Sequence, residues 1–215
     1  MNETLHLCQE WDKVFPLSDE VHHHKTTFTN RYGITLAADV YESKKASGKL
    51  PGIAVSGPFG AVKEQASGLY AHQLAKRGFF TIAFDPSYTG ESGGFPRNVA
   101  SPDINTEDFM AAVDFLSVQE NVDSDKIGIL GICGFGGMAL NAATLDTRIK
   151  ATVTSTMYDM TRVNANGYFD EEDSEKIRFQ KKEALSKQRT IDFKNGNYAS
   201  AGALPDEIPD GAPQY

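Results

Sequence analysis

Between residues 51 and 156, short apolar runs alternate with stretches in which apolar residues recur at helical spacing. Runs that are apolar on both faces are typical of buried parallel strands. They predict four strands, over residues 51–56, 79–84, 127–132 and 149–155. Helices are predicted over 64–77, from 106 onwards with Asn105 or Thr106 as N-cap, and over 136–145. This alternation predicts an α/β fold with a mostly parallel, doubly wound sheet.

The segments on either side of this region have different patterns. Residues 25–30 and 35–42 alternate polar and apolar positions around a turn, which predicts a β-hairpin. Residues 170–189 are strongly charged and predict a helix or a helix pair, and residues 195–215 are polar and rich in Pro and Gly. These flanking segments add no further parallel strand to the sheet.

The same patterns divide the chain into three parts. No strand signal follows residue 155, although a parallel sheet needs both of its edges finished. We therefore expect the sheet to lack its C-terminal strands in this chain. The predicted parts are a lead-in over 1–24, an incomplete core over 25–157 and a helical lid over 158–215.

The composition argues against several classes of function. Of the 215 residues, 40% are hydrophobic and 23% are charged, as in ordinary globular domains. The net charge of -8 comes without a cluster of Lys and Arg, so we expect no binding to nucleic acid. No apolar run is long enough to span a bilayer, and residues 1–13 lack the pattern of a secretory signal. We expect no membrane partner.

The cysteines and histidines bear on compartment and on metal binding. Cys8 and Cys133 are too few for a disulfide framework, so we expect a reduced compartment, the cytoplasm. His22-His23-His24 resembles a metal-binding tract, but no second group of ligands has a matching spacing. We interpret the tract as a polar lead-in to a strand, and we expect neither a metal nor a cofactor.

The segment Gly131-Ile132-Cys133-Gly134-Phe135-Gly136-Gly137 carries the candidate chemistry. It runs from a predicted strand through a sharp turn into a helix of small residues. That is the context of a nucleophile elbow, Gly-x-Ser-x-Gly, whose strained nucleophile needs small neighbours. Counted from the strand, Cys133 holds the nucleophile position. Counted back from Gly136-Gly137, the nucleophile position falls on Gly134, which has no side chain. The alternative that Cys133 is a buried structural cysteine therefore remains.

A second segment, Gly57-Pro58-Phe59-Gly60, follows the first buried strand. In an elbow fold, the N–H after the nucleophile and an N–H from this loop hold the oxyanion. These would be the N–H groups of Gly134 and Phe59, because Pro58 has none. The alternative is that the segment is only a tight turn.

Four motifs together resemble a known family: Gly57–Gln65, Phe84–Gly94, Gly131–Gly137 and Met157–Met160. They are similar to bacterial α/β-hydrolases of the dienelactone-hydrolase and S15-peptidase-like group, in the branch that includes fungal polyketide transferases. The resemblance implies an α/β-hydrolase fold. Dienelactone hydrolase has a cysteine at its elbow, which favours Cys133 as nucleophile.

The resemblance also implies a catalytic acid and a histidine that follow the nucleophile. All five histidines of this sequence precede Cys133. We therefore expect a complementary C-terminal segment or a second chain to carry the catalytic histidine. Asp159 is a possible acid, although a polar residue at the mouth of the lid is the alternative. Tyr88 and Glu91 are candidates for the pocket, and Glu91 could equally cap a helix.

Three functions follow from these residues. The first is hydrolysis of an ester, lactone or thioester by nucleophilic acyl transfer through Cys133. The second is acyl or polyketide transfer by the same thiol to an acceptor other than water. The third is a non-catalytic binding protein on a hydrolase scaffold, which Phe135 and the ambiguous elbow favour. In the first two the partner is a small-molecule acyl substrate.

Overall fold

The computed structural model describes residues 3–200, and the chain divides into two compact units between Thr161 and Arg162. The first unit contains the strands β1 Val21–Thr29, β2 Thr35–Ser43, β3 Leu50–Ser56, β4 Phe80–Phe84, β5 Val122–Ile132 and β6 Ile149–Ser155. Its helices are α1 Ala66–Ala75, α2 Pro102–Ser117 and α3 Gly134–Leu145. The second unit contains most of α4 Met160–Asn166, then η1 Tyr168–Asp170 and α5 Glu175–Asn195.

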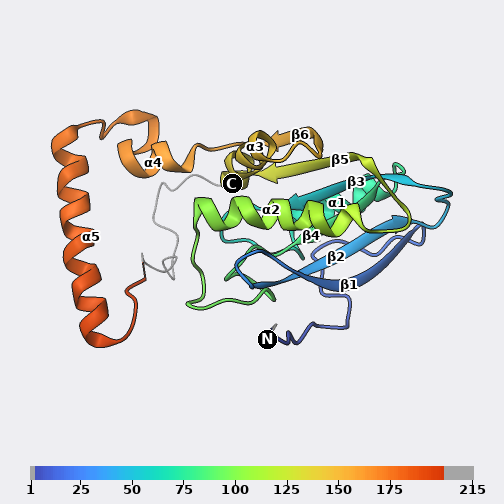
Figure 1. The fold of residues 1–215 in the computed structure, drawn as a ribbon, viewed down its shortest axis with the longest axis horizontal. Helices are drawn as coiled ribbons and strands as arrows, with labels where there is room; N and C mark the ends of the chain where they lie inside the picture. Colours follow the sequence, from blue (N-terminus) through green and yellow to red (C-terminus); the bar gives the residue numbers. More distant parts are fainter. Residues whose placement is uncertain (1–2, 201–215) are drawn as a thin grey trace. The chain divides into compact units, whose positions relative to one another are not determined.

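The six strands form one sheet in the order β1-β2-β4-β3-β5-β6 (Figure 1). β1 and β2 form the predicted hairpin, and β2 pairs antiparallel with β4. β4, β3, β5 and β6 are parallel, which confirms the prediction of a mostly parallel, doubly wound sheet. Since parallel strands end at the same edge of a sheet, the segments that follow these four strands gather there.

Several elements begin at other residues than the sequence predicts. α2 begins at Pro102, because Ser101 is its N-cap and accepts a hydrogen bond from the N–H of Ile104, so the prediction of Asn105 or Thr106 as cap is wrong. α3 begins two residues early, at Gly134. β1 begins at Val21 and includes the His22-His23-His24 tract.

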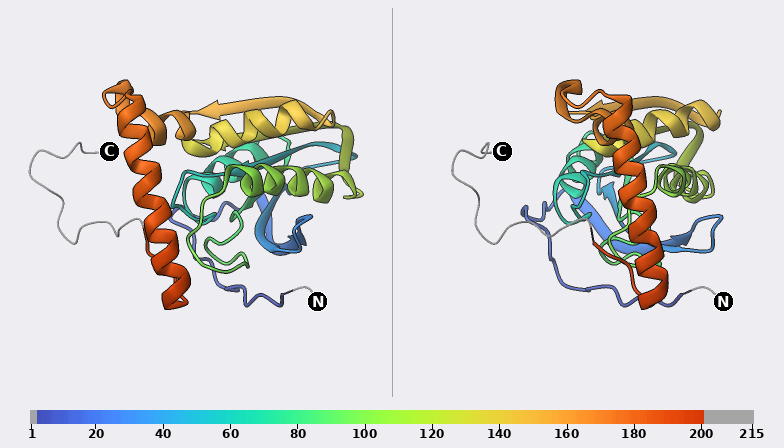
Figure 2. Two further views of the ribbon diagram at one scale, coloured as in Figure 1. Left: turned by 60° about the vertical axis from the view of Figure 1, so that its left-hand side comes forward. Right: turned by 90° about the vertical axis from the view of Figure 1, so that its left-hand side faces the viewer.

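Helices cover both faces of the sheet, with α1 on one side and α2 on the other (Figure 2). The face under α2 and α3 holds the larger apolar cluster, with fully buried Phe109, Leu116 and Ile129. The face under α1 holds a smaller cluster, to which Phe15 of the N-terminal segment contributes. Helices and the lead-in therefore cover most of the sheet on both faces, whereas no residue of β6 is buried.

The second unit is a charged helical segment. Ser174 is the N-cap of α5, and Gly196 ends the helix in the left-handed conformation that glycine favours. Arg162 pairs with Asp170. Phe179 and Phe193 are exposed on α5. The predicted helix over 170–189 is thus present as the longer α5, and its role as a lid stays a prediction; residues 201–215 of the predicted lid lie outside the described residues.

Candidate active site

Cys133 occupies the sharp turn between β5 and α3. Its backbone has φ 56° and ψ −127°, in the left-handed half of conformational space that residues with a side chain rarely adopt. Three hydrogen bonds hold this conformation: the Cys133 N–H donates to Ser155 O at 2.9 Å, and its carbonyl accepts from the N–H groups of Gly136 and Tyr158. Strain that the surroundings over-determine is typical of functional positions.

The glycines around Cys133 leave no room for a side chain. A Cβ on Gly131 would collide with the carbonyl oxygen of Phe135, and one on Gly134 would collide with the ring of Phe59. Phe135 fits at its position because its side chain belongs to the apolar cluster under α2 and α3. The positive φ therefore lies at Cys133, the position that the count from the strand side gives, and not at Gly134.

The surroundings of the thiol combine packing with partial exposure. Cys133 is a half-buried free cysteine and packs against the cluster under α1. It stands directly before α3, whose N-terminal N–H groups favour negative charge. Cys133 thus combines apolar contacts with partial exposure of the residue.

The loop after β3 is pressed against this turn. A Cβ on Gly57, whose φ is +98°, would lie 2.5 Å from the carbonyl oxygen of Ile132. The Phe59 ring lies against Gly134, and its centroid is 5.5 Å from that of Phe135. Within the described residues, no protein acceptor receives the N–H of Phe59 or the N–H of Gly134. The two N–H groups predicted to hold the oxyanion therefore lie in adjoining segments, and neither donates a hydrogen bond to another described residue.

Asp85, at the end of β4, fastens this loop. It is fully buried, and its carboxylate accepts the Lys63 N–H at 2.7 Å and the Lys63 ammonium at 3.1 Å. It also accepts the N–H of Glu91 at 2.9 Å. One carboxylate thus holds together the loop after β3 and the loop after β4.

Lys63 belongs to a larger set of charges that we call the ion network: Asp12, Lys13, Lys25, Asp39, Lys63, Glu64, Asp85 and Glu91. The side chain of Lys63 has no exposed surface and also contacts Glu64 at 2.5 Å and Glu91 at 2.6 Å. Burial alone would lower the pKa of Lys63, but the carboxylates around it outweigh burial and hold this pKa above its usual range. The lysine therefore stays charged inside the protein.

Tyr88 and Glu91 lie in the loop after β4. Glu91 caps no helix: its carboxylate accepts the N–H of Cys8 at 2.6 Å and binds Lys25 and Lys63. Tyr88 has φ 70°, and its ring packs beside Gly94. Among the described residues it lines neither of the two cavities that border Phe59 and Gly134.

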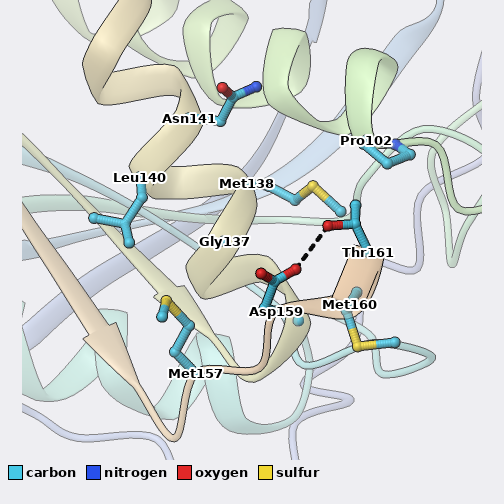
Figure 3. A pocket seen from close by; sticks show the side chains of 10 residues that line it. Pro102, Gly137, Met138, Leu140, Asn141, Met157, Asp159, Met160 and Thr161 are labelled. Carbon is cyan, nitrogen blue, oxygen red and sulfur yellow. Dashed lines mark hydrogen bonds between the residues drawn. The ribbon is translucent and has the colours of Figure 1, made fainter. Parts of the chain in front are cut away.

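A cavity of about 380 Å³ opens beside the N-terminal turns of α3 (Figure 3). Its wall consists of Pro102, Gly134, Gly137, Met138, Leu140, Asn141, Met157, Asp159, Met160 and Thr161. Gly134 is therefore part of the wall, whereas Cys133 stands next to it. Asp159 is exposed and accepts a hydrogen bond from the Thr161 hydroxyl at 2.7 Å.

The described histidines lie away from hydrogen-bonding reach of the thiol. His72 is buried on α1, and neither of its ring nitrogens has a hydrogen-bond partner. His23 on β1 binds Asp39 through Nε2 at 2.6 Å. Neither imidazole forms a hydrogen bond with Cys133.

Sequence reasoning missed Lys63 and the anchoring role of Asp85. The only signal was position: Asp85 ends a buried strand, and Lys63 follows a Gly-rich loop. A lysine carries no sign of burial in its sequence context, because lysine is usually exposed.

Two further observations concern the part of the chain that the structure describes. It contains no group of three or more His, Cys, Asp or Glu residues placed to hold a metal ion. None of its helices has the length and apolarity needed to cross a membrane.

Known proteins are similar to this chain over much of its sequence. The sequence profile of the X-Pro dipeptidyl-peptidase (S15) family matches residues 32–204. The uncharacterized protein PA2218 of Pseudomonas aeruginosa is 63% identical over 199 residues, which are 92% of this chain and 53% of that protein. The thiohydrolase aneE of Aspergillus aculeatus is 35% identical over 104 residues, 48% of this chain and 33% of that protein.

Solved structures agree on the fold. The crystal structure of PA2218 has a TM-score of 0.88 at 62% identity and covers 91% of this chain and 61% of that one. The α/β-hydrolase GrgF of a Penicillium species has a TM-score of 0.70 at 22% identity, with 83% and 57% covered. The fold is therefore that of α/β-hydrolases, as the resemblance implied. The chain spans about half the length of PA2218.

Proposed function

The chain belongs to the X-Pro dipeptidyl-peptidase (S15) family, and on that basis we propose that Cys133 is the nucleophile of an acyl-transfer hydrolase acting on an ester, lactone or thioester. The observation that carries this proposal is the strained backbone of Cys133, with two unused N–H groups in the adjoining segments. A buried structural cysteine needs neither feature. Among these substrates a thioester is favoured, because the similar protein aneE is named a thiohydrolase.

The proposed reaction has two steps. The Cys133 sulfur bonds to the substrate carbonyl carbon, and the thiol proton passes to a histidine. The carbonyl oxygen becomes negative and accepts hydrogen bonds from the N–H groups of Phe59 and Gly134. The bond to the leaving alcohol or thiol then breaks, and the leaving group takes the proton from the histidine. Water, deprotonated by the same histidine, next attacks the acyl-cysteine and releases the acid and the thiol.

We place the histidine outside these 215 residues, in another segment or in a second chain. His72 is buried without a partner, and His23 binds Asp39. We also place the acid there, because a triad acid is buried behind its histidine, whereas Asp159 is exposed and binds the Thr161 hydroxyl. Asp159 then belongs to the cavity wall.

Substitution of the nucleophile tests the proposal in the whole protein. Cys133→Ala should lower kcat/KM for p-nitrophenyl esters and for thioesters by at least about 10³-fold, because acyl transfer through the thiol is lost. Iodoacetamide should label Cys133 in the wild type, and substrate should protect it. Product analysis with a competing alcohol or amine separates hydrolysis from transfer to another acceptor.

Cys8→Ser is the matched control, because Cys8 is the other free cysteine and its contact with Glu91 uses the main chain. It should keep full activity. Undiminished turnover by Cys133→Ala would contradict the proposal. So would a wild type that neither turns over any of these substrates nor reacts at Cys133, and that result would favour a binding protein on a hydrolase scaffold.

A further inference from the structure

We propose that the cavity beside α3 receives the acyl chain of the substrate, and that it takes uncharged aliphatic chains longer than acetyl. This inference rests on the proposed function, since the cavity matters only if an acyl group is held at Cys133. Gly134 supplies both the predicted oxyanion N–H and part of the cavity wall. An acyl chain whose carbonyl oxygen meets that N–H therefore has this cavity as a neighbouring space.

The wall chemistry favours a flexible aliphatic chain. Met138, Met157 and Met160 surround the cavity with thioether side chains (Figure 3). Methionine is unbranched and polarizable, so such walls adapt to chains of different shape. Leu140 and Pro102 add further apolar surface. The volume of about 380 Å³ lies within the range of small-molecule sites, about 300–1,000 Å³.

The charge of the wall argues against an acyl chain that ends in a carboxylate. Asp159 is the one charged residue among those that line the cavity in the described part of the chain. Asn141 and Thr161 are polar and uncharged. A second carboxylate in this cavity would lie near that of Asp159, and the two negative charges would repel each other. Because Asp159 is exposed, we expect a modest effect, about two- to fivefold in kcat/KM.

Gly137 is the position at which the cavity can be filled with least disturbance. It lies in α3, and a Cβ built on it would meet only Tyr158 O, at 3.5 Å, an ordinary contact. Gly136, the preceding residue, is different, because a Cβ there would lie 2.8 Å from the side chain of Met157. A larger side chain at Gly137 therefore enters the cavity without a backbone clash.

The experiment compares acetyl, octanoyl and ω-carboxyoctanoyl thioesters of one thiol in the whole protein. The wild type should prefer octanoyl over acetyl in kcat/KM, because each buried methylene adds binding energy. Gly137→Leu should lower the octanoyl-to-acetyl ratio by at least about tenfold. Thr144→Leu places the same side chain on an exposed position of α3 and should leave the ratio unchanged. Asp159→Asn should lower the ratio of octanoyl to ω-carboxyoctanoyl turnover by about two- to fivefold, because it removes the repulsion of the terminal carboxylate.

The outcomes separate this inference from the proposed function. If the wild type turns over thioesters through Cys133 but Gly137→Leu keeps the octanoyl-to-acetyl ratio, the cavity does not bind the acyl chain. A uniform loss with Asp159→Asn on all three substrates, about 10³-fold or more, would make Asp159 a triad acid and overturn its place in the wall. Gly137→Ala, which favours the helix, repeats the test with a smaller change in the same direction. Iodoacetamide labelling of Cys133 reports in each variant that the elbow is intact.

Discussion

The two faces of the sheet are stabilised by different forces. The face under α2 and α3 packs aromatic and aliphatic side chains such as Phe109, Leu116 and Ile129. The face under α1 has a smaller apolar cluster, and beside it runs the ion network, in which Lys13 and Lys63 have no exposed side-chain surface. The face under α2 is mainly an apolar core, with the fully buried Asp108 hydrogen-bonded to Asn30 and Ser87, and the other face combines apolar packing with several buried ion pairs.

The difference follows from what each face must hold. Apolar packing is non-directional and suits helices that lie flat on a sheet. Hydrogen-bonded ion pairs are directional, and they fix loops whose own side chains bury little apolar surface. On the α1 side, Asp85 and Lys63 fix the loop that carries Phe59, and Lys13 fixes the N-terminal segment to Asp39. Buried charges thus lie where loops, including one at the candidate site, need a defined position.

The largest expected effect comes from removing one charge of the network. Lys63→Met leaves Asp85, Glu64 and Glu91 close together without the cation that they share. Breaking a buried pair costs about 3–5 kcal/mol of unfolding free energy. Denaturant titration should show this loss, and the loss should shrink between pH 8 and pH 5, because protonation relieves the repulsion among the carboxylates that remain. If the proposed function holds, kcat should also fall by at least about tenfold, since the loop with Phe59 shifts.

Lys13→Met is the matched control for Lys63→Met. Lys13 is equally buried, but its partners are Asp12 and Asp39 and it does not contact the loop after β3. The Lys13→Met variant should have a lower unfolding free energy and the wild-type kcat. Iodoacetamide should label Cys133 at the wild-type rate in both Lys13→Met and Lys63→Met. Equal kcat values for both variants would mean that the network stabilises the fold without positioning the loop.

This contrast explains how much the sequence could predict. Short runs that are apolar on both faces predicted the parallel strands, and the Gly-rich motif after one of them predicted the sharp turn at Cys133. The N-cap of α2 was missed, because Ser101 and Asn105 both have suitable side chains and only the backbone decides between them. The ion network joins residues far apart in the chain, such as Lys25 and Glu91, and no local pattern links them. The long-range charges that hold the site therefore needed the structure.

Removing a buried apolar side chain from the face under α2 and α3 should also lower the unfolding free energy strongly, but without dependence on pH. Leu116 on α2 is fully buried in the cluster under α2 and α3. Leu116→Ala should lower the unfolding free energy by about 2–5 kcal/mol, through lost burial and an unfilled cavity. Denaturant titration should give the same loss at pH 5 and pH 8, because Leu116→Ala removes only apolar contacts. If the loss of unfolding free energy in Leu116→Ala depended on pH as strongly as that in Lys63→Met, the two faces would be coupled. They would then not be stabilised by separate forces.

The smallest expected effect concerns His72, a polar residue inside the α1 face. Burial, with smaller contributions from Lys76 and His23, lowers the pKa of His72 below its ordinary value of 6.5. The unfolded chain therefore takes up a proton as the pH falls through 6.5, while the folded protein does not. Stability from this source is complete above pH 6.5 and is lost as the pH falls towards the folded pKa.

His72→Leu should flatten this dependence in thermal melts between pH 7 and pH 5, because leucine fills a similar space and does not titrate. His22→Leu, at an exposed position of β1, should keep the wild-type slope. Parallel slopes for His72→Leu and the wild type would show that His72 binds its proton equally well in both states. The acid sensitivity of the α1 face would then come from its ion pairs alone, and the apolar cluster under α1 would behave like the cluster on the opposite face.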